Sequence, residues 1–465
     1  MIRLAIAELR EDTRLWVGPF LVAIISAAFV YLAAVYWWTL GTPEGAALIE
    51  SLGSTVDEAR AGSYVVYVST AVPAIAVLGT GAAATITALS TRIARWRLAG
   101  ASPSQIRRAI TVQVLLVNAV GAVAGIIVAS PFCQSAVDLL VRMVTREDRS
   151  FPVANAIPAA LLAIVGATLV SYFASFIPAR RAARISAVHA VRDETEATVT
   201  MPVSRWIVAG FAVLFLLQQV IVTIGATLTL GSDSIGGSSA ATLSMMTGLA
   251  VLAIIVALAP VLVPQFIRLW TAILPARRLP AWTLARFFAT GQPRRTATAV
   301  MPIAVGLALY GILFGIITTW QDALTRGGIT ATLNSLDTYV MLTPAAAISI
   351  AGSIASVLLS TRARTRDAAA LRVAGASPRT LIGIAFAEAT AYALAATVLG
   401  LGIAAASVAT TAFMLTAGGL PAAPLLDLRQ MGVLALVATV ALLTVLLVPA
   451  LSAVRRNPRD ALAAL

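Results

Sequence analysis

The sequence predicts an all-α integral membrane protein: ten transmembrane helices in two parallel four-helix repeats joined by a two-helix linker, with both termini in the cytoplasm. Three observations predict this fold class. The chain of 465 residues is 59% hydrophobic and only 11% charged, whereas about 25% of the residues in soluble domains are charged. Long apolar runs alternate with short polar segments along the whole chain. Finally, one polar decapeptide occurs twice between such runs.

The apolar runs give the number of spans, because a helix needs about 20 apolar residues to cross the hydrocarbon core of a bilayer. Ten runs meet this length without Asp, Glu or Arg, except that the ninth contains Glu388. They are Trp16–Leu40, Ser63–Ser90, Ile110–Val137, Phe151–Ala179, Trp206–Leu230, Ser234–Pro264, Thr296–Gln321, Thr338–Thr361, Leu381–Thr411 and Met431–Val454. The first run is too long and begins too late for a cleaved signal peptide, so we expect it to be a span.

The arginines predict the orientation of the spans, because cytoplasmic loops carry an excess of basic residues. All 33 basic residues are arginine, and all but six fall on the side of the N-terminus when the ten runs alternate in direction. The six on the other side are Arg60, Arg142, Arg146, Arg149, Arg326 and Arg429. Both termini are therefore expected in the cytoplasm.

The repeated decapeptide indicates an internal duplication. RLAGASPSQI (Arg97–Ile106) lies between the second and third runs, and RVAGASPRTL (Arg372–Leu381) lies between the eighth and ninth. Six of the ten positions are identical, and both copies fall on the predicted cytoplasmic side. Because each four-helix unit begins inside, the repeats are parallel rather than inverted. We expect three parts: residues 1–192, a linker with the fifth and sixth spans at 193–280, and residues 281–465.

Each decapeptide is predicted to end one short helix and to start the next. A glycine suits the position just past a helix end, where φ is positive, and Ser-Pro suits the N-cap and the first helical position. These residues are Gly100, Ser102 and Pro103 in the first copy and Gly375, Ser377 and Pro378 in the second. Gln105 completes a capping box after the first serine, whereas Thr380 leaves the second box incomplete.

Two equivalent basic turns facing the cytoplasm favour docking to a two-fold symmetric partner, of which an ATPase dimer is the obvious candidate. The alternative is that both are simple turns at the membrane surface, where basic residues contact anionic lipid. The residues assigned to docking are Arg92, Arg95, Arg97, Gly100, Ala101, Ser102, Pro103, Arg372, Gly375, Ala376, Ser377 and Pro378.

At these residues the chain resembles the permeases of the FtsX/MacB-like superfamily of ABC transporters. The likeness covers Met1–Arg192 and about Leu284–Leu465, and it includes the segments PARRAARISAVHAV (Pro178–Val191) and PALSAVRRNPRDAL (Pro449–Leu462). The resemblance implies a coupling helix before each glycine of the decapeptides. It also implies a separate ATP-hydrolysing subunit, in two copies, and a tandem architecture in which one chain forms the whole two-fold unit.

The order of four, two and four spans resembles the bacitracin-export-type permeases, but the outer loops are short. Those permeases carry a large extracellular domain between spans 7 and 8, where this chain has only about Asp322–Asp337. MacB-like permeases carry a large domain between spans 1 and 2, where this chain has only Gly41–Gly62. Coupling to a periplasmic adaptor or to an outer-membrane channel is therefore not expected.

The chain itself is not expected to be an enzyme. It has no lysine and no G-x-x-x-x-G-K-[ST] motif, so ATP and Mg²⁺ are expected in the partner subunit and no cofactor in this chain. One cysteine, Cys133, excludes an internal disulfide, and one histidine, His189, removes most histidine-based metal ligation.

Glu388 is the only charged residue inside a predicted span, and Gln113 occupies the equivalent place in the first repeat. A carboxylate inside the membrane is a candidate functional group. The alternative is a structural polar bond across the interface between the repeats. At the outer end of the first span, the cluster Tyr36-Trp37-Trp38 is predicted to form an interfacial belt, and Arg60 is predicted to lie in a solvated loop.

The favoured function is therefore an ABC permease that exports or extracts a hydrophobic or amphipathic substrate, such as a lipid, lipopeptide, antimicrobial peptide or drug. The alternative is an FtsX-like transmembrane lever that regulates cell-envelope proteins. An ion-driven transporter is a weaker third hypothesis, because Glu388 alone is a poor basis for ion coupling. The expected location is the plasma membrane, with membrane lipid as a further partner and no nucleic acid. The arginine-rich and alanine-rich composition favours a high-GC Gram-positive bacterium.

Overall fold

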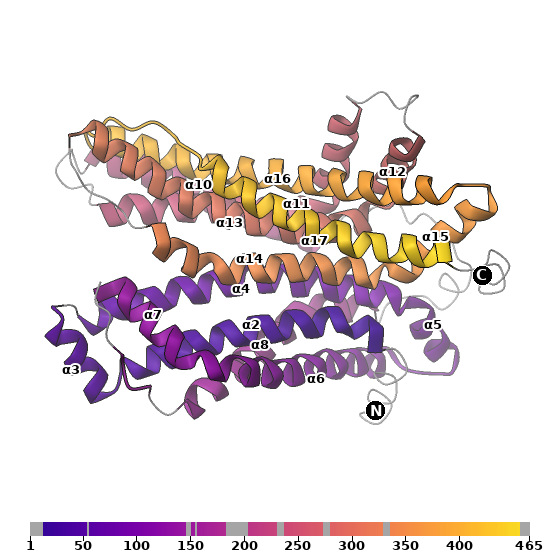
Figure 1. The fold of residues 1–465 in the computed structure, drawn as a ribbon, viewed down its shortest axis with the longest axis horizontal. Coiled ribbons are helices and arrows are strands. Elements are labelled where there is room, and N and C mark those ends of the chain that lie inside the picture. The colour runs from indigo at the N-terminus through magenta and orange to yellow at the C-terminus, as the bar shows by residue number, and fades with distance from the viewer. Residues whose placement is uncertain are drawn as a thin grey trace. The chain divides into compact units, whose positions relative to one another are not determined.

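The computed structural model describes residues 13–53, 55–145, 150–153, 156–182, 203–229, 237–272, 280–328 and 335–455. In these ranges the chain forms helices and no strand, which confirms the predicted all-α class (Figure 1). His189 and most of the segments after the fourth and tenth runs lie outside the described residues. The helices fall into two compact units, called unit 1 and unit 2 below.

Unit 1 comprises the N-terminal helices and one helix from much later in the chain. Tyr339–Leu359, from α14 (Ser335–Leu359), belong to unit 1 rather than to the unit that holds the rest of the second repeat. The other helices of unit 1 are α2 (Thr13–Thr39), α3 (Pro43–Ser51), α4 (Val56–Ala88), α5 (Ser90–Leu98), α6 (Pro103–Ala129), η1 (Ser130–Phe132), α7 (Cys133–Thr145) and α8 (Ile157–Ala182).

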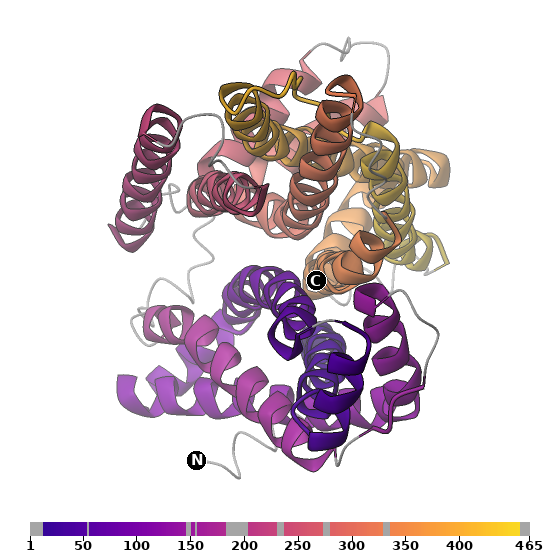
Figure 2. The same cartoon turned by 90° about the vertical axis from the view of Figure 1, so that its left-hand side faces the viewer.

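Unit 2 comprises α10 (Val203–Thr229), α11 (Gly237–Thr271), α12 (Pro280–Gly291), α13 (Pro293–Arg326), α15 (Thr361–Val373), α16 (Pro378–Ala417) and α17 (Leu428–Arg455). The long helices of each unit run side by side and are seen nearly end-on in Figure 2. Packing thus groups α14 with unit 1, whereas the sequence repeats group it with residues 281–465; those repeat boundaries stay a prediction.

Nine helices of the described residues are long and apolar enough to cross a membrane. They correspond to nine of the ten predicted spans. The second predicted span lies in α4, where Val66–Leu78 forms a shorter apolar stretch. The length of α16, 40 residues, corresponds to about 60 Å at 1.5 Å per residue. This helix is therefore about twice as long as the hydrocarbon core is thick, about 30 Å.

Glycines allow the longest helices to cross closely, because apolar helices in lipid gain little from the hydrophobic effect and associate through van der Waals packing. A Cβ on Gly125 of α6 would lie 2.3 Å from the carbonyl oxygen of Ile24 on α2. A Cβ on Gly400 of α16 would lie 2.7 Å from the Cβ of Leu307 on α13. The two glycines are equivalent in the sequence repeat. Each repeat therefore has a glycine-mediated crossing at the same place.

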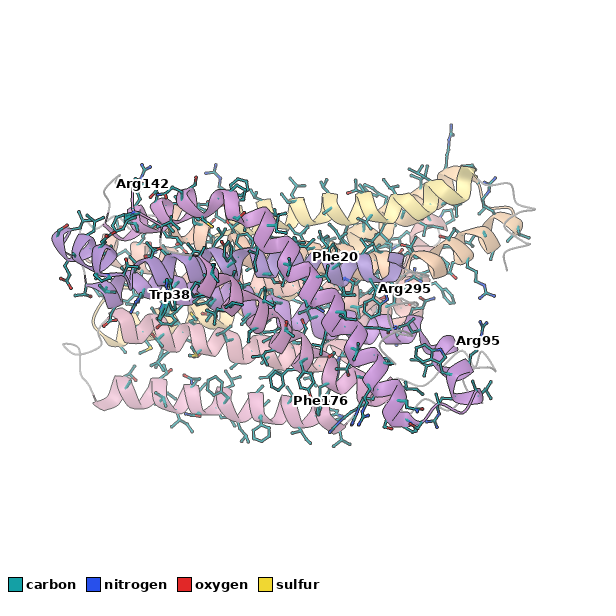
Figure 3. All side chains as sticks on the ribbon, turned by 90° about the horizontal axis from the view of Figure 1, so that it is seen from below. Phe20, Trp38, Arg95, Arg142, Phe176 and Arg295 are labelled. Atoms are coloured by element: carbon teal, nitrogen blue, oxygen red, sulfur yellow. The ribbon has the colours of Figure 1, made fainter. Side chains whose placement is uncertain are left out.

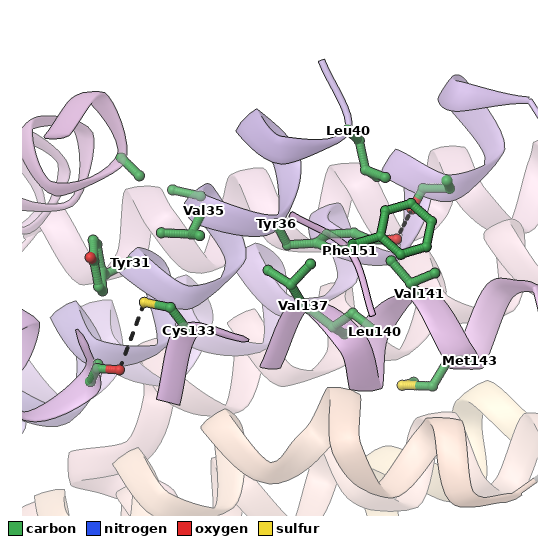
Figure 4. Close-up of a cluster of buried hydrophobic side chains, with 14 of the residues drawn as sticks. Tyr31, Val35, Tyr36, Leu40, Cys133, Val137, Leu140, Val141, Met143 and Phe151 are labelled. Carbon is green, nitrogen blue, oxygen red and sulfur yellow. Dashed lines mark hydrogen bonds between the residues drawn. The ribbon is translucent and has the colours of Figure 1, made fainter. Parts of the chain in front are cut away.

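In unit 1, α3 and α7 form a small cap at the end opposite α5 (Figures 1 and 4). The side chains of Tyr36, Ile49 and Phe151 are fully buried in its core, and the Tyr36 hydroxyl donates to the carbonyl of Ala59 at 2.7 Å. The prediction that Tyr36 belongs to an interfacial belt is therefore wrong. The reason is that the short segments after the first span fold back as helices and cover this side chain.

The rest of the aromatic cluster is also structured. The guanidinium of Arg60 lies over the ring of Trp37, 4.4 Å from its centroid, whereas Trp38 is 43% exposed. Arg60 is thus held in α4 by a cation–π contact. The prediction that it lies in a solvated loop is wrong, because α4 begins at Val56 and includes it.

The glycine crossings give a test of the packing. Replacing Gly125 with Ala is expected to lower the midpoint of thermal unfolding in detergent, because a Cβ 2.3 Å from a backbone oxygen forces α2 and α6 apart. Overpacking of this kind costs about 1–3 kcal/mol. The control is Gly402→Ala on α16, where a Cβ would meet nothing within 4 Å. Equal midpoints for the two variants would contradict the proposed crossing.

Candidate functional site

The two decapeptides lie in the same local structure. Each follows a short helix that is separated from the preceding long helix by one residue with φ −90° and ψ 0°, Leu89 before α5 and Ser360 before α15. Helix α5 has 9 residues and α15 has 13. The difference is close to one turn of 3.6 residues. The extra turn therefore leaves both decapeptides facing the same way relative to their short helices.

Both short helices end in a Schellman motif. Gly100 has φ +88° and Gly375 has φ +91°, which confirms the predicted positive φ at both positions. In α5 the N–H of Ala101 donates to the carbonyl of Trp96 at 2.9 Å, and the N–H of Gly100 donates to that of Arg97 at 3.0 Å. The second copy repeats this pattern. The last carbonyls of each short helix are thus paired although the chain turns sharply.

The next helix begins at once in both copies. The Ser102 hydroxyl accepts from the N–H of Gln105, and the Gln105 side chain accepts from the N–H of Ser102 at 2.9 Å, which confirms the capping box before α6. The Ser377 hydroxyl accepts from the N–H of Thr380 at 3.2 Å before α16, without the reciprocal bond. Each turn is therefore fixed on both sides by its own backbone and cap.

The tip of each turn is accessible and combines apolar and basic side chains. Leu98 and Val373 occupy equivalent positions and are 66% and 51% exposed. Arg95 is exposed, and Figure 3 shows it at the end of unit 1 opposite Trp38 and Arg142. Of the other predicted docking residues, the exposed ones are Gly100, Pro103, Gly375, Ser377 and Pro378, and the partly buried ones are Arg97, Ala101, Ser102, Arg372 and Ala376. The side chain of Arg92 lies outside the described residues.

Glu388 forms a buried ion pair with the second short helix. Nη1 of Arg364 on α15 lies 2.5 Å from Oε2 of Glu388 on α16, and the two side chains are 8% and 6% exposed. The Tyr392 hydroxyl donates to the other carboxylate oxygen. Burial by itself lowers the pKa of the Arg364 guanidinium, but the Glu388 carboxylate outweighs this effect, so that the pKa lies above its ordinary value. Arg364 is therefore charged in this buried site.

A hydroxyl of α13 lies near Tyr392 but is bonded elsewhere. The Thr296 hydroxyl is 3.5 Å from that of Tyr392 and donates to the carbonyl of Ala289 on α12 at 2.7 Å. A second ion pair joins Arg295 of α13 to Asp367 of α15 at 3.4 Å. Thus α15 is bonded to both α13 and α16. These contacts lie within unit 2, so the predicted alternative of a bond across the repeat interface does not describe Glu388.

Gln113, which aligns with Glu388, is 1% exposed on α6 and carries no charge. In unit 1, Ile93 of the short helix packs among Ile106 and Ile110. Sequence analysis did not identify Arg364 as the partner of Glu388. The signal that could have identified it is that a buried carboxylate requires a cation, and the extra turn of α15 supplies one.

The ion pair gives a second test. Glu388→Gln is expected to lower the unfolding midpoint strongly, because it leaves the Arg364 guanidinium buried without its counter-charge, a loss of about 3–5 kcal/mol. The double variant Arg364→Met/Glu388→Met is expected to lose less stability than Arg364→Met or Glu388→Met alone. The reason is that an apolar pair leaves no buried charge. Thermal unfolding in detergent measures both effects, with Gln113→Met as the matched variant in unit 1. If the double variant lost as much stability as the two single variants together, the pair would not hold α15.

One family model matches the chain twice, and both matches contain a decapeptide. The FtsX-like permease C-terminal model matches residues 86–187 and 339–458. The first match includes α5 and α6 and the second includes α15 and α16, with their glycine turns. No curated protein matches the chain. Together with the apolar helices of the described residues, the double match indicates a multi-pass membrane protein of permease type. Over these two segments the chain is therefore similar to the FtsX-like permeases.

Proposed function

We propose that the chain is the transmembrane permease subunit of an ATP-driven ABC transporter and is moved by a separate ATPase dimer. The observation that carries this proposal is the repeated turn: the same Schellman motif and serine cap follow a short helix in both family-matched segments. Two equivalent sites fit the two subunits of a symmetric dimer. ATP and Mg²⁺ would bind to the dimer.

The chemistry of the turns supports docking. An exposed leucine or valine at the tip supplies apolar area for a pocket on the partner, and neighbouring arginines supply charge. Buried apolar anchors within a charged rim provide most of the binding energy in many protein interfaces. Both turns are rigid through their caps, so little conformational entropy would be lost on binding.

The orientation of the chain in the membrane follows from its arginine-rich segments. With the arginine-rich segments in the cytoplasm, both turns and both termini are cytoplasmic, and the cap of α3 and α7 is outside. This arrangement places the docking turns where ATP is available. The spans are apolar, and in the described part of unit 2 Arg364 pairs with Glu388 and Arg295 pairs with Asp367. A lipid, lipopeptide, antimicrobial peptide or drug taken from the bilayer suits such spans better than an inorganic ion does. We propose export or extraction of such a substrate.

The double variant Gly100→Val/Gly375→Val tests the proposal. Valine is strongly disfavoured at positive φ, so both turns would distort. We expect an ABC ATPase, identified by its own Walker A sequence, to co-purify with the tagged wild-type chain and to be lost from the variant. The matched control is Gly53→Val/Gly328→Val. These glycines also have positive φ, +77° and +74°, but Gly53 follows α3 and Gly328 follows α13, away from the turns.

Three results are informative. Loss of the ATPase from the turn variant alone supports docking at the decapeptides. Equal retention in both variants moves the docking site elsewhere on the chain. Absence of an ATPase from the wild type under mild conditions contradicts the ABC assignment.

A second candidate function is a transmembrane lever that regulates a cell-envelope protein. The observation that favours it is the cap of α3 and α7, a packed surface with its own buried core at the end of unit 1 opposite α5. A transporter with short outer loops has no evident need of such a platform. Crosslinking from Phe132, an exposed residue of η1 directly before α7, distinguishes the two functions: a specific outer protein partner favours the lever, and its absence favours transport.

A further inference from the structure

Helix α10 of unit 2 packs mainly against one neighbour, α11. Its buried residues form a narrow stripe on that side, made of Ala209, Ala212, Gln219 and Thr223. The rest of the helix surface is exposed and almost entirely apolar. Lipid covers apolar side chains adequately, so such a surface needs a protein partner only where it carries a group that lipid cannot satisfy.

Gln218 is such a group. It is exposed, and between Ile207 and Ala226 it is the only exposed polar residue of α10. The described residues supply no hydrogen bond to its amide. The apolar span of α10 is Arg205–Thr227. Gln218 lies two residues past the midpoint of this span, which is about 3 Å along the helix axis. The amide is therefore close to the centre of the membrane.

The depth of Gln218 keeps its amide away from water. The hydrocarbon core is about 30 Å thick, so each of its surfaces is about 15 Å from a central residue. A glutamine side chain is too short to span that distance. An amide in hydrocarbon without a hydrogen-bond partner is costly, and polar side chains in membranes form hydrogen bonds between helices. Gln218 therefore requires a polar group from another helix.

The residues around Gln218 have the spacing of a helix-pairing surface. Positions that are alternately four and three residues apart line the contact of two helices in a left-handed pair. On α10 this spacing selects a set of exposed residues, called the α10 seam below: Ile207, Phe211, Leu214, Gln218 and Ile221. At 3.6 residues per turn, the seam lies nearly opposite the stripe that contacts α11. A further helix can therefore cover the seam without displacing α11.

We propose that the α10 seam pairs with the α10 seam of a second copy of this chain. All copies have the same orientation in the membrane, so the two helices run parallel, and a parallel pair places each seam residue opposite its equivalent. Gln218 then faces Gln218 of the second copy. A carboxamide has both donor and acceptor atoms, so the two amides satisfy each other through reciprocal hydrogen bonds. A second copy thus supplies a matching polar group at the same depth.

The dimer has a two-fold axis along the membrane normal, which is the commonest symmetry of homo-oligomers. The apolar residues of the seam provide contact, and the glutamines fix the register. A slip of one turn along the seam would place each amide against an apolar side chain. This inference concerns the linker helices rather than the decapeptides. It therefore goes beyond the proposed function and does not depend on an ATPase.

Cysteine crosslinking of the full chain in its membrane tests the contact. Cys133 is the only cysteine, so Cys133→Ala gives a cysteine-free background. In that background, Leu214→Cys is expected to form a disulfide-linked dimer on mild oxidation with copper phenanthroline. The matched control is Val213→Cys, which lies at nearly the same depth but outside the seam; both native side chains are exposed, 64% and 42%. Equal crosslinking at the two positions, or a crosslink from Leu214→Cys to a different protein, would overturn the proposal.

The role of the amide is tested by the equilibrium between monomer and dimer. Energy transfer between donor-labelled and acceptor-labelled chains is measured in vesicles of phosphatidylcholine and phosphatidylglycerol over a range of protein-to-lipid ratios. We expect Gln218→Leu to weaken the dimer about tenfold, and the conservative Gln218→Asn to retain most of the affinity. The matched control, Gln219→Leu, removes the same amide from the side that faces α11 and is expected to leave the equilibrium nearly unchanged.

The outcomes decide the proposal separately from the proposed function. Monomers at every density in the wild type, or a dimer that Gln218→Leu leaves unaffected, would overturn it. Equal weakening by Gln218→Leu and Gln219→Leu would also overturn it, because the effect would then be a general loss of helix packing. If the leucine variants fail to fold, the crosslinking of Leu214→Cys still decides whether the seams meet. None of these results changes with the presence of an ATPase, whereas the test of the proposed function depends on recovering one.

Discussion

The need to pair backbone polar groups wherever a helix ends determines this structure. A chain that leaves a long apolar helix, runs as a short basic helix and returns must reverse direction twice within a few residues. Helix ends expose unpaired carbonyls and N–H groups at each reversal. Glycine at positive φ closes the first end and a serine hydroxyl closes the second, as at Gly100 and Ser102. The position of the exposed apolar tip, and hence the candidate docking surface, follows from this geometry.

Close approach of the long helices is a second constraint. Apolar side chains gain little by leaving lipid for one another, so the units depend on contacts that only small residues allow. The aligned glycines Gly125 and Gly400 provide such contacts in α6 and α16. In unit 1, Gly352 of α14 meets Val77 of α4, and Gly18 of α2 meets Ala355 of α14. These small-residue contacts explain how a helix from the second repeat packs with the helices of the first.

The two copies share the turn, and in unit 2 an ion pair attaches the short helix. The added turn in α15 keeps the orientation of the decapeptide and brings Arg364 within reach of Glu388. A buried pair of this kind contributes little net stability compared with apolar side chains, because desolvation offsets the attraction. The pair does, however, fix the distance and direction between α15 and α16.

The sequence by itself determined the helical class, nearly all of the long apolar helices, and the local structure of the two turns. These features depend on composition and on residues within a few positions of each other, such as Ser102 and Gln105 or Gly100 and Trp96. Only the tertiary structure decided which helices pack together, that Tyr36 is the core of a cap, and that Arg364 is the partner of Glu388. The residues involved are separated by 23 or 24 positions in the two hydrogen-bonded cases. Local propensity does not specify such pairs, because they form only when the helices that carry them have packed side by side.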